Sequence, residues 1–202
     1  MTVALAAAGF AAVGSFAATL AAVLCRTLVA FDDGPRSGRP RPAMLVFAAA
    51  AVGASLAIHH ADGRTYALGA LLIASVVACT YCDVARGLIP DYFTLAPLVA
   101  VIGVSLTAHD VQPVFAAMAI GAPFGLAALL SRGRGMGWGD VKFAALAGAV
   151  LGIERAICAF IAASLIAAGF ALARRRRSEP IAFVPYLAGS AAAALALVPG
   201  AP

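Results

Sequence analysis

The chain has 202 residues, 63% of them hydrophobic, with a mean hydropathy of +1.00 and a formal net charge of +5. This composition is far more apolar than that of a soluble domain, so we predict a membrane protein. Apolar runs recur along the whole length with short polar breaks, which leaves no room for a separate soluble domain. The basic residues lie beside these runs, and we expect no nucleic-acid partner.

The apolar runs predict an all-α, polytopic transmembrane helical bundle of about eight spans, at about twenty residues per crossing. In chain order the predicted spans lie near residues 3–25, 43–59, 65–82, 92–108, 113–131, 141–151, 153–173 and 181–198. The first span has no basic n-region and is long for a signal peptide, so we expect it to be retained. The sixth is too short to cross alone, so we expect it to merge with its neighbour or to tilt within the bundle.

The basic residues orient these spans. With eight crossings and the N-terminus outside, Arg64 and Arg155 fall on the outer side, near the three histidines. The other twelve of the fourteen basic residues fall on the cytoplasmic side, as the positive-inside rule requires; they are Arg26, Arg36, Arg39, Arg41, Arg86, Arg132, Arg134, Lys142 and Arg174 to Arg177. The run from Arg174 to Arg177 is then explained as a stop signal that faces anionic lipid.

The four cysteines, Cys25, Cys79, Cys82 and Cys158, lie in or beside apolar runs. This placement does not favour a disulfide framework. Cys79 and Cys82 form one CxxC, but zinc needs two further ligands and no second pair follows at a suitable spacing. We therefore interpret these cysteines as small packing residues and expect no metal site.

Three carboxylates, Asp83, Asp91 and Asp140, come out at the cytoplasmic ends of predicted spans and so can share one site. Asp91 follows Pro90 where the fourth span begins, which suits a structural helix cap or first-turn acid. Asp83 ends the third span, where a negative charge opposes the helix macrodipole. An ionisable group of this kind in a membrane protein is a functional candidate.

Asp140 follows a glycine-rich stretch, GMGWGD, residues 135–140. Its glycines allow positive φ angles and close backbone approach, so the loop can bend into the bundle and carry Asp140 to a fixed position. The structural alternative is that Asp140 caps the sixth helix and Lys142 lies at the lipid interface. Two carboxylates held close together can share a proton, one acting as base on a water and the other as acid toward an amide. This is aspartic protease chemistry, and it needs neither a metal nor a Ser/His pair.

These residues resemble the prepilin peptidases of bacteria, a family of GxGD intramembrane aspartyl proteases. The resemblance is carried by DVARGLIPD (83–91), GMGWGDVKFAALAGAVLG (135–152) and IAFVPYLAG (181–189). It implies that Asp83 and Asp140 are the catalytic pair and that Gly137, Gly139 and Lys142 position the loop and the substrate. It also implies a multi-pass protein of the bacterial inner membrane that cleaves type IV prepilins or pseudopilins just before their hydrophobic helix.

With this resemblance, residues 1–202 are expected to form a single membrane-embedded peptidase domain, with two N-terminal spans in 3–60 and a peptidase core in 65–198. Long family members carry a cysteine-rich insertion after the first span and methylate the new N-terminus. This chain has only RTLVAFDDGPRSGRPRPA there, so we expect neither methyltransferase activity nor a cofactor. The alternative function is a transporter or proton channel with acids in a cytoplasmic vestibule, which would place acids near the midplane and show a repeat.

Overall fold

The computed structural model describes residues 2–28, 41–87, 89–131, 137–173 and 184–197. Within these ranges the chain forms eight α-helices, one short 3₁₀ helix and no strand. The elements are α1 (Val3–Leu28), α2 (Pro42–Ile58), α3 (Gly63–Arg86), η2 (Asp91–Phe93), α4 (Leu95–Thr107), α5 (Gln112–Leu130), α6 (Trp138–Leu151), α7 (Ile153–Ala173) and α8 (Val184–Leu197). The predicted all-α helical bundle is confirmed.

The helix lengths correct the predicted number of spans. Four of the described helices, α1, α3, α5 and α7, are long and apolar enough to cross a membrane. The helices α2, α4 and α8 are apolar but shorter, because 13 to 17 residues at 1.5 Å each reach only about 20–26 Å of a hydrocarbon core of about 30 Å. Within the described residues, helices long enough to cross therefore number fewer than the predicted spans of about eight.

The sixth and seventh predicted spans do not merge. Gly152 separates α6 from α7 with φ 78° and ψ 168°, a conformation that residues other than glycine rarely adopt. The N–H of Gly152 donates to the carbonyl of Gly148 and closes α6. Because the backbone turns here, α6 remains a separate helix of 14 residues.

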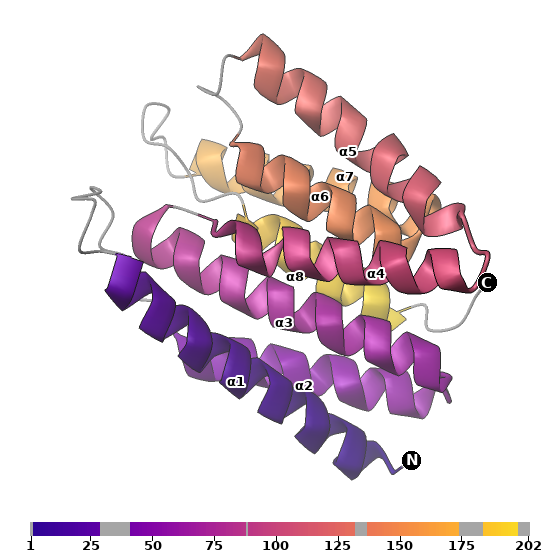
Figure 1. Ribbon diagram of the computed structural model, residues 1–202. Coiled ribbons are helices and arrows are strands. Elements are labelled where there is room, and N and C mark those ends of the chain that lie inside the picture. The colour runs from indigo at the N-terminus through magenta and orange to yellow at the C-terminus, as the bar shows by residue number, and fades with distance from the viewer. Residues whose placement is uncertain (1, 29–40, 88, 132–136, 174–183, 198–202) are drawn as a thin grey trace.

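Two helices, α3 and α6, lie at the centre of the bundle (Figure 1). Helix α3 packs against α1, α2, α4, α6 and α8, and α6 packs against α3, α4, α5, α7 and α8. Successive helices run in opposite directions, so the last turn of α3 and the first turn of α6 lie at the same end of the bundle (Figure 1).

Small residues let the helices approach closely, as is common in membrane bundles. A Cβ at Gly53 would lie 2.6 Å from the carbonyl oxygen of Ala6, and one at Gly148 would lie 2.8 Å from that of Ala116. Large side chains fill the centre, where Phe143 on α6 and Leu72 on α3 are fully buried. On the outside, Phe47 and Leu165 are 76% and 68% exposed, as suits helices that face lipid.

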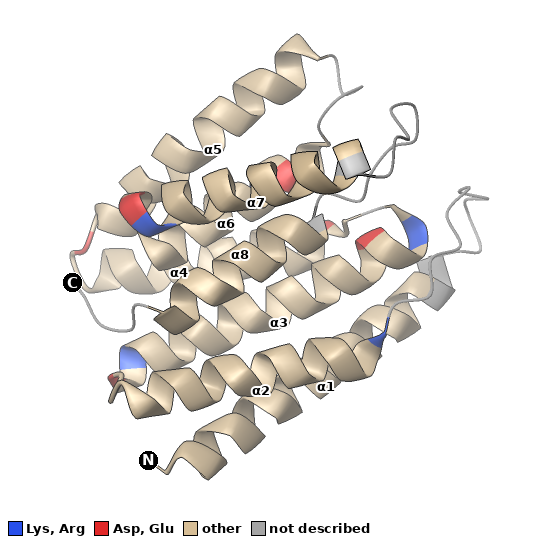
Figure 2. Ribbon diagram, turned by 180° about the vertical axis from the view of Figure 1, so that it is seen from behind, with Lys and Arg blue, Asp and Glu red and all other residues tan. Residues whose placement is uncertain are grey.

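The described charged residues gather toward the two ends of the helices (Figure 2). One end carries Arg41, Asp83, Arg86, Asp91, Asp140 and Lys142, and the other carries Asp62, Arg64, Asp110, Glu154 and Arg155. Which end faces the cytoplasm stays a prediction, because several basic residues that orient the chain lie outside the described residues: Arg36, Arg39, Arg132, Arg134 and Arg174 to Arg177.

Candidate active site

Asp83 lies in the last turn of α3, three residues before the helix ends. The helix stops at Gly87, which adopts the left-handed conformation with φ 68° and whose N–H donates to the carbonyl oxygen of Asp83 at 2.7 Å. The Asp83 side chain is only 6% exposed. A buried carboxyl group at a helix C-terminus gains nothing from the macrodipole, so helix stability does not account for it.

Asp140 lies in the first turn of α6, at the third helical position. Gly137 is the N-cap residue, and its N–H donates to Oδ2 of Asp140 at 3.2 Å. The N–H of Asp140 donates in turn to the carbonyl oxygen of Gly137 at 3.1 Å. The carboxylate therefore closes the start of the helix in the manner of a capping box, and it remains partly accessible.

The structure places Asp83 and Asp140 at the same end of two helices that pack against each other. At 1.5 Å per residue, each lies within about 5 Å of its helix end along the axis. Neither acid lies at the middle of a helix, where a transporter of the kind considered above would hold it.

The segment from Ile89 to Thr94 follows α3 in the chain and contacts both α3 and α6, and we call it the bridging segment. Ile89 contacts Gly139, where an added Cβ would lie 2.7 Å from both the Cβ and the Cδ1 of Ile89. Asp91 Oδ1 accepts a hydrogen bond from Lys142 Nζ at 2.5 Å, and this ion pair joins η2 to α6. On the other side of the segment, the Cys79 thiol of α3 lies 3.9 Å from the carbonyl oxygen of Phe93.

Close approach, and not a positive φ angle, explains the glycine at 139. Among the described glycines, positive φ angles occur at Gly87 and Gly152. Gly137 has φ −81° and ψ 151°, an ordinary extended conformation. A Cβ at Gly137 would meet Asp140 Oδ2 at 3.6 Å and the backbone nitrogen of Gly139 at 3.9 Å, both ordinary contacts, so of these two glycines it is Gly139 that packing requires. Residues 135 and 136 of the glycine-rich stretch lie outside the described residues.

Two features near the end of α3 were not predicted from the sequence. Thr80 precedes it by three residues and so shares its helix face; its hydroxyl is buried and has no hydrogen-bond partner in the part of the chain that the structure describes. The spacing of three residues on a predicted helix would have identified Thr80 as a residue on the same face as Asp83. Cys25 of α1 donates a hydrogen bond to Cys82 Sγ at 2.8 Å, a contact between buried thiols for which the sequence gives no signal.

Asp91 was predicted as a structural cap or first-turn acid. It lies in the first turn of η2, whose N-cap is Pro90, and its carboxylate pairs with Lys142. Among the described residues, no three His, Cys, Asp or Glu side chains come together in a way that could hold a metal ion.

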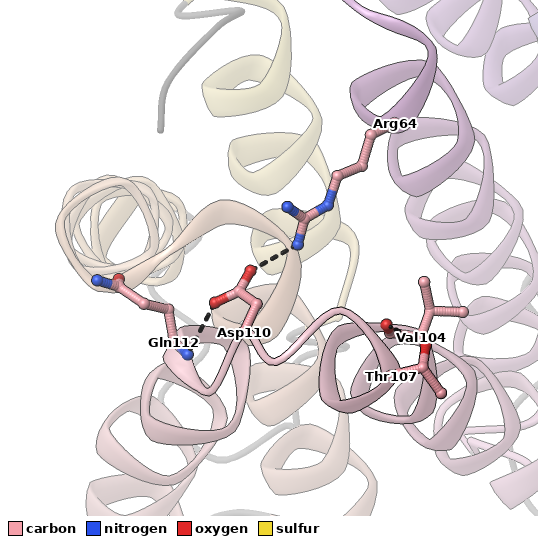
Figure 3. A network of polar contacts seen from close by, with 5 residues as sticks. All are labelled: Arg64, Val104, Thr107, Asp110 and Gln112. Atoms are coloured by element: carbon pink, nitrogen blue, oxygen red, sulfur yellow. Dashed lines mark hydrogen bonds and ion pairs between the residues drawn. The ribbon is translucent and has the colours of Figure 1, made fainter.

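Two acids at the opposite end of the bundle, Asp62 and Asp110, have structural partners. Asp62 caps α3 by accepting from the N–H of Thr65 at 3.0 Å, and the hydrogen bonds from Thr65 lower the pKa of Asp62. Asp110 pairs with Arg64 at 2.6 Å and accepts from the N–H of Gln112 at 3.1 Å (Figure 3). The bond from Arg64 lowers the pKa of Asp110. Asp62 caps a helix and Asp110 ties α3 to the turn between α4 and α5, so these two acids are not candidates for the site.

Residues 70–172, about half of the chain, match the model of the type IV leader peptidase family. The matched region contains the last turn of α3, the bridging segment and the whole of α6. No curated protein and no solved structure matches the chain. The extent of the family match and the apolar helices lead to one conclusion: this chain is a membrane peptidase that belongs to the type IV leader peptidase family.

Proposed function

We propose that this protein is an aspartyl endopeptidase that removes the leader peptide of type IV prepilins or pseudopilins at the cytoplasmic face of the bacterial inner membrane. Asp83 and Asp140 are the proposed catalytic pair. The observation that carries the proposal is their position in the terminal turns of two packed central helices, at one end of the bundle. Residues 1–202 then form one membrane-embedded peptidase domain with its core in 65–198.

The chemistry needs only the two carboxyl groups and water. One carboxylate takes a proton from the water as the water oxygen bonds to the scissile carbonyl carbon, and the other, protonated, carboxyl group donates to the carbonyl oxygen. When this intermediate collapses, the C–N bond breaks, the leaving nitrogen takes the proton that the first carboxylate removed from the water, and the second carboxylate takes back the proton that it gave to the carbonyl oxygen. The products are a leader with a new carboxyl group and a mature subunit with a free amine.

The substrate must reach Asp83, which is 6% exposed. A peptide whose cleavage site precedes a hydrophobic helix has to unwind locally before its amide can be attacked. The first turn of α6, with Gly137 and Gly139, lies beside Asp140 and offers exposed backbone at Gly137 for holding an extended peptide. We therefore assign Gly137, Gly139 and Lys142 to positioning of the loop and the substrate.

The test is cleavage of a prepilin-like peptide by the purified protein in detergent with EDTA present. Asp83→Asn and Asp140→Asn are each expected to lower kcat by at least about 100-fold, because either change removes one half of the acid and base pair. Asp110→Asn at the opposite end is the control and is expected to cleave at the wild-type rate. Thermal unfolding of each variant shows that it is folded. Activity lost only in Asp91→Asn, or lost in EDTA and restored by zinc, would contradict the proposal.

A further inference from the structure

An ion pair joins the bridging segment to α6. Asp91 Oδ1 and Lys142 Nζ lie 2.5 Å apart although the residues are 51 positions apart in the chain. Their side chains are 59% and 28% exposed, and water weakens the attraction between such charges. The pair therefore adds little to the stability of the fold, and the location of its two residues suggests another role.

Asp91 belongs to the bridging segment, which follows α3 in the chain and contacts both helices that carry the proposed catalytic acids. Toward α3, this segment is held by the contact between Cys79 and the Phe93 carbonyl oxygen at 3.9 Å. Toward α6, it is held by Ile89 against Gly139 and by Asp91 against Lys142. Movement of the segment away from α6 would change how the first turn of α6 lies relative to the last turn of α3.

Lys142 and Asp140 point to different parts of the molecule. The two residues are two positions apart on a helix, about 200° around its axis, so their side chains do not face each other. The Asp140 carboxylate turns back to Gly137, whereas Lys142 reaches out to η2. Its ammonium group therefore holds α6 from the side away from Asp140.

We propose that the Asp91–Lys142 ion pair positions the first turn of α6 against the end of α3, and so sets the separation of Asp83 and Asp140 during cleavage. The inference rests on the proposed function, in which these two acids share the reaction. Asp91 and Lys142 are then positioning residues: they touch neither the scissile amide nor the attacking water. In this proposal, position 91 holds an acid because its carboxylate pairs with Lys142 on α6.

A charge-reversal cycle tests this role in the peptide cleavage assay. Asp91→Lys and Lys142→Asp are each expected to lower kcat by about two- to fivefold, the size expected for an exposed ion pair, with KM nearly unchanged. The double variant restores the pair with its charges exchanged and is expected to return kcat to within about twofold of the wild type.

The chain offers a matched control at the other end of the bundle. Arg64 in the first turn of α3 and Asp110 in the turn between α4 and α5 form a second exposed ion pair, at 2.6 Å and with side chains 48% and 28% exposed (Figure 3). Reversal of either charge there disturbs a comparable contact far from the proposed site. We expect the variants Arg64→Asp and Asp110→Arg to leave kcat unchanged.

Two results would overturn the proposal: a double variant whose loss equals the product of the two single losses, or a control pair whose reversal lowers kcat as much. If the reversed variants do not fold, a neutral cycle of Asp91→Asn and Lys142→Met replaces them, and the double variant should lose no more than either single one. Asp83→Asn is assayed in parallel. If it still cleaves, the proposed function fails; if it is inactive and the cycle shows no coupling, only the positioning role fails.

Discussion

The contact between Ile89 and Gly139 makes Gly139→Ala a direct test of how the bridging segment sits on α6. A Cβ at position 139 would lie 2.7 Å from the Cβ and the Cδ1 of Ile89. Carbon atoms in ordinary contact are about 3.5–4.0 Å apart, so the two elements must separate by about 1 Å. Because the Cβ of Ile89 is attached to the backbone, no rotamer change relieves the overlap.

The expected loss of activity is larger than the loss of stability. Overpacking costs about 1–3 kcal/mol, and the exchange of glycine for alanine inside a helix returns about 1 kcal/mol. The net destabilisation is therefore about 0–2 kcal/mol, and the variant stays folded. A displacement of about 1 Å at a catalytic group can lower a rate by about 100-fold, so we expect kcat to fall by about 10- to 100-fold.

The measurement is peptide cleavage by the purified variant, with thermal unfolding recorded on the same sample. Gly125→Ala is the control, because Gly125 lies on α5 facing α6 and an added Cβ would lie 3.7 Å from Val141 Cγ1, an ordinary contact. This variant should keep the wild-type rate. Equal rates for Gly139→Ala and Gly125→Ala would refute the argument that the backbone at 139 requires close approach.

Two further outcomes are expected. Oxidation of the detergent-purified protein by copper phenanthroline should join Cys25 to Cys82, so the number of thiols that react with a maleimide after denaturation should fall from four to two. The Cys25→Ser variant should not form this disulfide. An unchanged count of four in the wild type would show that α1 does not pack on α3 as described. A subunit processed by the purified protein with a methyl donor present should carry an unmethylated N-terminal amine, and a mass increase of about 14 Da would contradict this.

The positions of the helices followed from hydropathy, but several of their ends did not, and two of these ends carry the candidate acids. The third span was predicted to end at residue 82, yet α3 continues to Arg86 because its last turn stays helical until Gly87 turns the backbone. The sixth was predicted from residue 141, yet α6 begins at Trp138 because Gly137 serves as its N-cap and Asp140 closes the first turn. Polar residues in terminal turns lower hydropathy without breaking the helix.

Contacts between distant parts of the chain were beyond the reach of the sequence. Periodicity shows which residues share a helix face, but not which helix lies opposite that face. Asp91 and Lys142 were each identified as residues of interest, whereas their pairing depends on η2 and α6 lying side by side. The contact between Cys25 and Cys82, 57 positions apart, likewise depends on the packing of α1 against α3.

The structure also gives a physical reason for the spacing of seven residues between Asp83 and Pro90. After Asp83 the helix needs its last residues to finish a turn, and Gly87 then takes the left-handed conformation that releases the chain from the helix axis. Pro90, with φ −66° and ψ 136°, keeps the chain extended, and Ile89 before it is biased the same way. This path lays Ile89 on Gly139 and brings Asp91 to Lys142. The spacing is therefore the length of chain needed to pass from an acid on α3 to the first turns of α6, where the second acid lies.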